Sequence, residues 1–314
     1  MQSSGAFLTA TFGVLAACAL IWPTPTDVPQ NRPTREEIRR EASLRARRSL
    51  SWAERESLTA AERQLAPLRE FFSAAKTRTP QFAASALGWS SKWRLAADKL
   101  PFTDGNRHAS FLRQTFNEQL FASEELTRAV EQAVSSYGDA IAEIENRMLV
   151  KLRQDVSDLP ASALPEFADE NALSVAYQGA LRRTLDHVHA DLKADLAQEL
   201  VSLVAGEVLA QVAVRLGVSA GILTAGASAS WATFGAGLVA GVIVDQLVGW
   251  IWDWWADPTG NLTAELNQKL DHLEQLIIAG DDATPGLKGA LAEFGRRRSE
   301  VRRAAIADLL GASE

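Results

Sequence analysis

The chain has 314 residues, and its formal net charge of −7 is modest. Its length allows two domains of ordinary size and a substantial buried core. A general nucleic-acid-binding protein carries a net basic domain, so the acidic balance argues against nucleic acid as a partner. The single cysteine, Cys18, excludes an intrachain disulfide framework and a zinc site made from several cysteines.

The N-terminus carries an uncharged apolar segment over residues 5–22. As a helix these residues would measure about 27 Å, slightly less than the hydrocarbon core of a bilayer. Trp22 would then lie at a membrane interface, and Pro23 would end the helix. The pattern therefore predicts an uncleaved membrane anchor over residues 1–23.

Two other interpretations of this segment stay open. The sequence Leu15-Ala16-Ala17-Cys18 resembles the lipobox of bacterial lipoproteins, and that resemblance implies a lipidated Cys18 at the mature N-terminus. Cleavage as a secretory signal, or burial as a soluble helix, is the other alternative, although the basic residues that usually begin a signal are missing.

The expected location is the inner membrane of a bacterium, with the soluble part in the periplasm. Arginines near a span favour the cytoplasmic side, and all of those here follow Trp22, which would leave the body in the cytoplasm. However, the first arginine, Arg32, lies ten residues beyond the span. A short N-terminal apolar segment is also the usual signal for export.

Arginine is concentrated in two places. Seven arginines lie in residues 32–48, and five more lie in residues 296–303. Runs of this kind can contact anionic lipid headgroups, at about 1 kcal/mol per residue near the surface. Glutamates are interleaved with both runs, and we favour their interpretation as solvated helix faces.

A helical body is predicted over residues 36–200, after a Pro-rich linker over residues 24–35. The body is rich in good helix formers, and no strand pattern longer than a few residues interrupts it. The expected fold class is therefore all-α, a helical bundle or coiled coil. Two motifs have the form of capping boxes and predict helix starts: Ser51-x-x-Glu54 and Thr59-x-x-Glu62.

The clearest periodicity predicts a long helix over residues 124–155, packed on one or two partner helices. Its apolar residues recur in steps of four and three over nearly three heptads: Val130, Val134, Tyr137, Ile141, Ile144 and Met148. Pro160 and Pro165 predict the loop that follows. Another helix is expected over residues 172–200, and two amphipathic helices are expected over residues 257–314.

Residues 216–244 carry no charge, and they predict a hydrophobic helical hairpin over residues 201–256. Small residues recur every four positions in it, which lets helices approach closely in lipid or associate with another protein. Tryptophan prefers the membrane interface, and the residues expected there are Trp231, Trp250, Trp252, Trp254 and Trp255. A buried hairpin in a soluble bundle is the alternative.

The few polar groups of the hairpin predict a pairing between its two helices. Glu207, Gln211 and Arg215 are spaced by four residues and share one helix face. Asp245 is the one charge of the second helix before its aromatic end. Ionisable groups inside a membrane usually face a partner, so Asp245 is predicted to pair with Arg215 or to hydrogen-bond with Gln211. Contact of these groups with lipid headgroups is the alternative.

The segments 221–226 and 233–245 resemble bacterial predicted membrane proteins, in which a long helical region precedes a Gly-rich hydrophobic segment. The resemblance implies a similar arrangement here and brings no activity with it. A hydrophobic hairpin that emerges from a helical bundle is also similar in outline to pore-forming colicins. That likeness is architectural and does not establish a function.

The sequence contains no phosphate-binding loop, dinucleotide fingerprint or nucleophile elbow. His187 and His189 point to different sides of a helix, so a metal site would need ligands from elsewhere. We therefore expect a non-enzymatic, membrane-anchored protein without a cofactor, acting as a scaffold or as a subunit of an envelope assembly. Its expected partners are the bilayer and other proteins. The alternative is a pore- or channel-forming protein that uses the Gly-rich hairpin.

Overall fold

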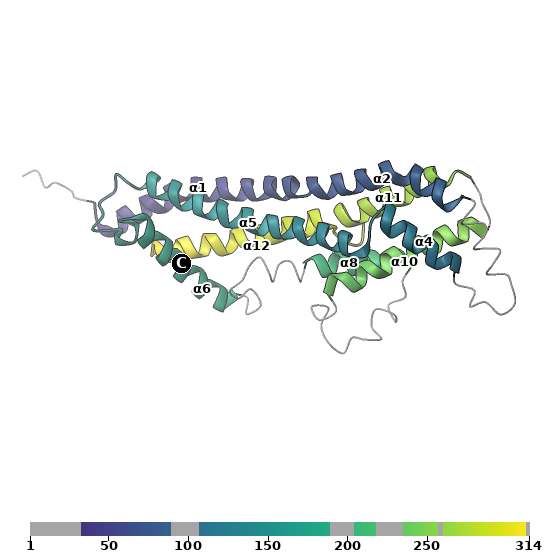
Figure 1. The fold of residues 1–314 in the computed structure, drawn as a ribbon. Helices are drawn as coiled ribbons and strands as arrows, with labels where there is room; N and C mark the ends of the chain where they lie inside the picture. The colour runs from purple at the N-terminus through teal and green to yellow at the C-terminus, as the bar shows by residue number, and fades with distance from the viewer. Residues whose placement is uncertain (1–32, 89–106, 189–203, 218–234, 257–259, 312–314) are drawn as a thin grey trace, which may run out of the picture. The chain divides into compact units, whose positions relative to one another are not determined.

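A computed structural model describes residues 33–88, 107–188, 204–217, 235–256 and 260–311. The chain divides into two compact units, Met1–Thr34 and Arg35–Glu314. The described part of the second unit is helical and contains no β-strand, which confirms the all-α class. Its elements are α1 (Arg35–Gln64), α2 (Ala66–Ala86), α4 (Arg107–Gln119), α5 (Ser123–Asp155), the short 3₁₀ helix η1 (Pro165–Phe167), α6 (Glu170–Val188), α8 (Gly206–Arg215), α10 (Gly235–Ala256), α11 (Leu262–Ile278) and α12 (Leu287–Leu309) (Figure 1).

The first helix, α1, is longer than the capping motifs predicted. Both Ser51 and Thr59 lie inside it, so neither begins a helix. The Thr59 hydroxyl donates to the backbone carbonyl of Arg55, 3.1 Å away, instead of capping a helix start. No glycine or proline occurs between residues 35 and 64 to end the helix. The break comes at Leu65, and Pro67 then lies in the first turn of α2, where proline is tolerated.

The predicted heptad helix is confirmed as α5. Its six seam residues are all buried, with Val130, Tyr137 and Ile141 completely covered. The helix lies against α1 along much of its length and also contacts α6 and α10 (Figure 1). The expected loop with Pro160 and Pro165 follows it and includes η1.

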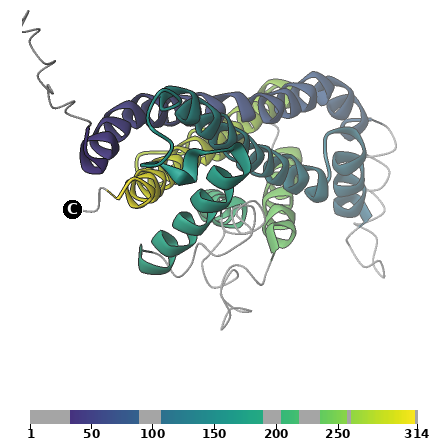
Figure 2. The ribbon, with the colours of Figure 1, turned by 90° about the vertical axis from the view of Figure 1, so that its left-hand side faces the viewer.

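The C-terminal helix α12 returns to the beginning of the chain. It packs between α1 and α6, and both views show it beside α1 (Figures 1 and 2). The turn before it requires a glycine, because Gly280 has a φ of 78° and an added Cβ would lie 2.1 Å from the carbonyl oxygen of Thr284. The predicted tail is thus part of the same compact unit as the predicted body.

The hydrophobic hairpin also belongs to this unit. Its helices α8 and α10 pack against each other, and α10 packs on α4 and α5 as well. Ala240, Ile243 and Ile251 of α10 are completely buried there. Among the described helices, none combines the length and the apolar character needed to cross a bilayer. The expectation that the second helix of the hairpin spans a membrane therefore lacks support.

Candidate functional site

The polar groups of the hairpin have partners other than those predicted. Arg215 pairs with Asp281 in the turn before α12, with 3.0 Å between the guanidinium Nε and the carboxylate. Asp245 pairs with Arg113 of α4 at 2.8 Å. The predicted pairing of Asp245 with Arg215 or Gln211 is therefore wrong. The prediction assumed that the two helices are isolated in lipid. In the structure α10 packs on α4, and this places the Arg113 guanidinium beside Asp245.

Glu207 and Gln211 do share a face of α8, and the Gln211 amide donates to the Glu207 carboxylate at 3.2 Å. Glu207 is exposed, as expected for a polar group on the outer side of a bundle helix. These two residues therefore form a local pair on one helix and do not link the two helices.

Four of the expected interfacial tryptophans lie at the aromatic end of α10 and have partners within the protein. The indole N–H of Trp254 donates to Glu265 at 3.1 Å, and that of Trp255 donates to the Ala86 carbonyl at 3.0 Å. Trp252 and Trp255 both pack on the buried ring of His108, and the Lys269 ammonium lies over the ring of Trp250. Packing of α10 on neighbouring helices accounts for these positions. Trp231 and Cys18 lie outside the described residues.

The most unusual chemistry of the described unit is a buried ionic cluster that the sequence analysis missed. Glu145 of α5 accepts two hydrogen bonds from Arg298 of α12, at 2.6 and 2.8 Å. Arg302, one helical turn later, has a side chain only 1% exposed and places its Nε 4.0 Å from the same carboxylate. Two cations thus share one anion inside the bundle.

Serine hydroxyl groups accept some of the hydrogen bonds that the second guanidinium group, that of Arg302, can donate. Arg302 donates to Ser299 at 2.6 Å and to Ser57 of α1 at 3.1 Å, while its Nη1 has no hydrogen-bond partner among the described residues. Loss of solvation lowers the pKa of Arg302. Burial also acts against the charge of Arg298, but the hydrogen bond and charge of Glu145 outweigh it and raise the pKa of Arg298. The cluster is therefore held mainly by the Glu145–Arg298 pair.

Both tyrosines of the chain, Tyr137 and Tyr177, lie beside this cluster. The Tyr137 ring packs edge-on against Phe294, and its hydroxyl lies so close to Gly295 that an added Cβ would approach it to 2.5 Å. Burial raises the pKa of Tyr137, and it raises that of Tyr177 together with the charge of Glu145. Within the described part of the chain, neither hydroxyl has a hydrogen-bond partner.

The native protein is expected to show no phenolate absorbance near pH 10, the ordinary pKa of tyrosine. A raised pKa in the folded state favours the neutral phenol, so the two tyrosines leave stability unchanged below pH 10 and weaken it as the pH rises further. A spectrophotometric titration would detect this, because phenolate should appear only together with loss of helical circular dichroism. The denatured chain is the control and should titrate near pH 10. Ionisation of a tyrosine in the intact helical protein would contradict the buried cluster.

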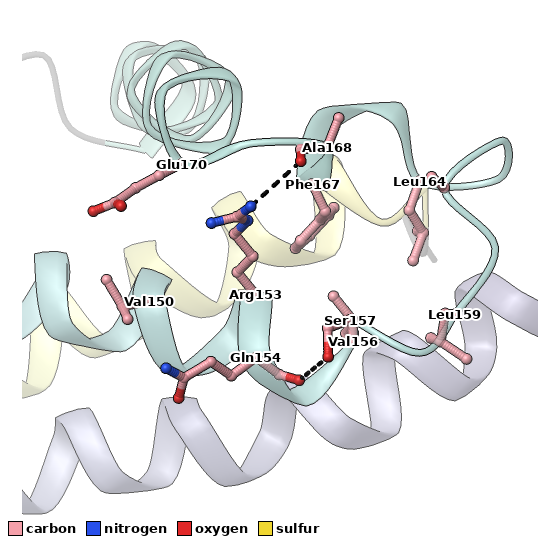
Figure 3. Close-up of a pocket in the computed structure, with 11 residues that line it drawn as sticks. Val150, Arg153, Gln154, Val156, Ser157, Leu159, Leu164, Phe167, Ala168 and Glu170 are labelled. Carbon is pink, nitrogen blue, oxygen red and sulfur yellow. Dashed lines mark hydrogen bonds between the residues drawn. The ribbon is translucent and has the colours of Figure 1, made fainter.

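The described unit also contains a pocket of about 340 Å³ between the end of α5 and the start of α6 (Figure 3). Its lining is mixed, with apolar side chains such as Leu164 and Phe167 beside polar ones such as Gln154. Arg153 crosses it to the Ala168 carbonyl at 3.4 Å, and the Ser157 hydroxyl donates to a backbone carbonyl at 2.8 Å. A serine bonded in this way and without a neighbouring base is not an activated nucleophile. The charged groups of the lining, Arg153 and Glu170, lie beside its apolar side chains.

The described residues contain no group of histidine, cysteine or acidic side chains placed to hold a metal ion. His189 lies outside them, and the side chain of His187 is not described. The sequence matches no protein-family model, and neither curated proteins nor solved structures give a match.

Proposed function

We propose that the protein is a non-enzymatic helical scaffold that its N-terminal apolar segment holds at a membrane. The observation that carries the proposal is the division of the chain into two units, with residues 5–22 in the first and all the described helices in the second. Residues 5–22 carry no charge and are long enough as a helix to reach most of the way across a bilayer core, which supports their role as an anchor.

The helical unit has the features of a structural part. The buried charged residues of its described part, Glu145, Arg298 and Arg302, interact with one another across α5 and α12. The pocket between α5 and α6 holds no activated nucleophile, because the Ser157 hydroxyl donates to a backbone carbonyl. We propose that this unit binds other proteins of an envelope assembly, or a second copy of the chain.

The outer side of α10 is the surface that we propose for such association. A Cβ added at Gly237, Gly241 or Gly249 would have no heavy atom within 4 Å, and Leu238 beside them is 54% exposed. Small residues of this kind let a second helix approach closely. The surface therefore supports self-association as one form of the scaffold.

Deletion of residues 1–23 tests the anchor. The full chain is expected to stay with the membrane fraction after a carbonate wash, which removes proteins held only by charge, and the shortened chain is expected to be released. Cys18→Ser is the matched control, since it keeps the apolar segment and removes the thiol. Release of Cys18→Ser would show attachment through a lipid on Cys18, and retention of the shortened chain would overturn the N-terminal anchor.

A pore-forming function is the second candidate, and the composition of α10 favours it. The first ten residues of this helix, 235–244, carry no charge, with Val242 half-buried and Leu238 exposed on the side away from the core. A helix that is apolar on all sides is suited to a core or to a membrane. In the same preparation, release of a trapped dye from vesicles by the shortened chain would support this candidate, and intact vesicles would count against it.

A further inference from the structure

The exposed face of α1 carries a row of four arginines. Arg40, Arg47, Arg48 and Arg55 are all exposed, and their spacing places them on one side of the helix. The opposite side of α1 packs on α5 and α12 (Figure 1). In the described part of the chain, no carboxylate lies within 4.0 Å of any of the four guanidinium groups. Arg45, which lies off this face, pairs with Glu41 and Asp158 instead.

The glutamates of the same stretch are neutralised elsewhere. Glu41 pairs with Arg45, and Glu54 pairs with Arg303 of α12. Glu56 pairs with Arg63, so its charge is also compensated away from this face. The face from Arg40 to Arg55 therefore keeps a surplus positive charge, although the whole chain carries a net charge of −7.

Two large apolar side chains lie among these arginines. Leu44 is 50% exposed and Leu58 is 49% exposed, and the spacing of both residues places them on the arginine face. From Arg40 to Leu58 the face extends for about 27 Å along the helix. Basic side chains around exposed leucines are the combination by which a helix rests on an anionic lipid surface, with the cations at the headgroups and the apolar groups below them.

The proposed anchor brings this face within reach of such a surface. Only twelve residues, 23–34, separate Trp22 from Arg35, the first residue of α1. Four of these residues are prolines, and an extended Pro-rich chain of this length spans at most about 37 Å. Tethering confines α1 to a short distance from the membrane, where even weak attraction is effective.

We infer that the arginine face of α1, formed by Arg40, Leu44, Arg47, Arg48, Arg55 and Leu58, is a docking surface for anionic lipid headgroups. The inference rests on the proposed function, because it needs a membrane beside the helical unit. Contact with the surface fixes the orientation of the unit, which the linker alone leaves free. The opposite face, with α5 and α12, is then directed away from the lipid.

The test uses residues 24–314, which include the complete helical unit, so that the anchor cannot mask the result. Sedimentation with vesicles measures the partition coefficient, with phosphatidylcholine alone or mixed with phosphatidylserine. Binding is expected only to the mixed vesicles and is expected to fall with added salt. Each arginine near the surface contributes about fivefold, so replacing all four with glutamine should reduce binding about 600-fold if all four reach the headgroups, and at least ~20-fold if two of them do.

The matched control replaces four exposed arginines outside this face with glutamine: Arg128, Arg147, Arg182 and Arg297. It changes the net charge equally and should reduce binding much less. Equal loss in the two variants would show attraction by overall charge and overturn the docking surface. Absence of binding to mixed vesicles by the folded parent would also overturn it, and would favour an acidic protein as the partner of this face. Neither result affects the carbonate test of the anchor, so the two proposals can fail separately.

Discussion

Ile141→Asp is expected to unfold the helical unit or to bring it close to unfolding. Ile141 is completely buried at the middle of the α5 seam, where α5 faces α1. An aspartate there would place a charge among apolar side chains and remove the packing of the isoleucine. We expect a cost of at least ~4 kcal/mol, comparable with the whole stability of a weakly stable domain. Thermal and denaturant unfolding followed by circular dichroism would measure it.

Ala142→Asp is the matched control for this substitution. Ala142 is the next residue of the same helix and is exposed, so the charge change is the same while the burial differs. Its effect should stay within about 1 kcal/mol, most of it from the lower helix propensity of aspartate. Equal melting temperatures for the two variants would show that the seam is not an internal surface.

Arg298→Met is expected to cost about 3–5 kcal/mol, because it leaves the buried Glu145 carboxylate without its bidentate partner. Arg302→Met should be nearly neutral or stabilising, since it removes a buried surplus cation whose Nη1 has no hydrogen-bond partner in the described structure. The two arginines lie one turn apart on the same helix and differ mainly in their distance from the carboxylate. Denaturant unfolding of both variants would separate these roles.

Two further variants make this comparison sharper. Glu145→Gln removes the anion that both guanidinium groups share, and it should destabilise the protein by a similar amount to Arg298→Met. Arg296→Met, which breaks only exposed ion pairs with Glu293 and Glu300, should cost less than ~1 kcal/mol. If Arg298→Met behaved like Arg296→Met, the Glu145–Arg298 pair would be solvated and would not support the bundle from within.

Local patterns were sufficient to predict the helices whose apolar residues repeat regularly. The steps of four and three from Val130 to Met148 identify both the span of α5 and its buried side. The helix boundaries around residue 60 were wrong, because Ser51 and Thr59 have the residue types of a cap but lie in a stretch without a breaker. A cap motif describes a local hydrogen bond, whereas a helix end also needs a reason for the backbone to leave the helix.

The ionic cluster was predictable in part from the sequence. Leu291, Arg298, Ala305 and Leu309 follow heptad spacing, so Arg298 and its neighbour Arg302 fall on the buried side of α12. The density of arginine in residues 296–303 instead suggested a solvated face, and for Arg296, Arg297 and Arg303 that interpretation agrees with their exposure. The choice of Glu145 as partner depends on the packing of α12 beside α5, which no local pattern contains.

The environment of the hydrophobic hairpin, residues 201–256, could not be decided from its sequence. An uncharged run with small residues is compatible with lipid and with the centre of a bundle, since both surroundings lack water. In this structure α10 packs on α4 and α5, as a helix of a bundle does. The partners of Asp245 and Arg215 then follow from tertiary neighbours, Arg113 and Asp281, that lie far from them in the sequence.

The position of α12 beside α1 also affects the synthesis of the protein. Arg302 donates to Ser57, which precedes it by 245 residues, so the inner side of the first helix is completed by the last. At translation rates of about 5–20 residues per second, α1 waits on the order of ten to fifty seconds for that partner. During this time α5 can cover α1, but its Glu145 has no arginine to bind. A chain that ends after α5 but before α12 therefore keeps a bare carboxylate at its core, and cellular proteases should remove it.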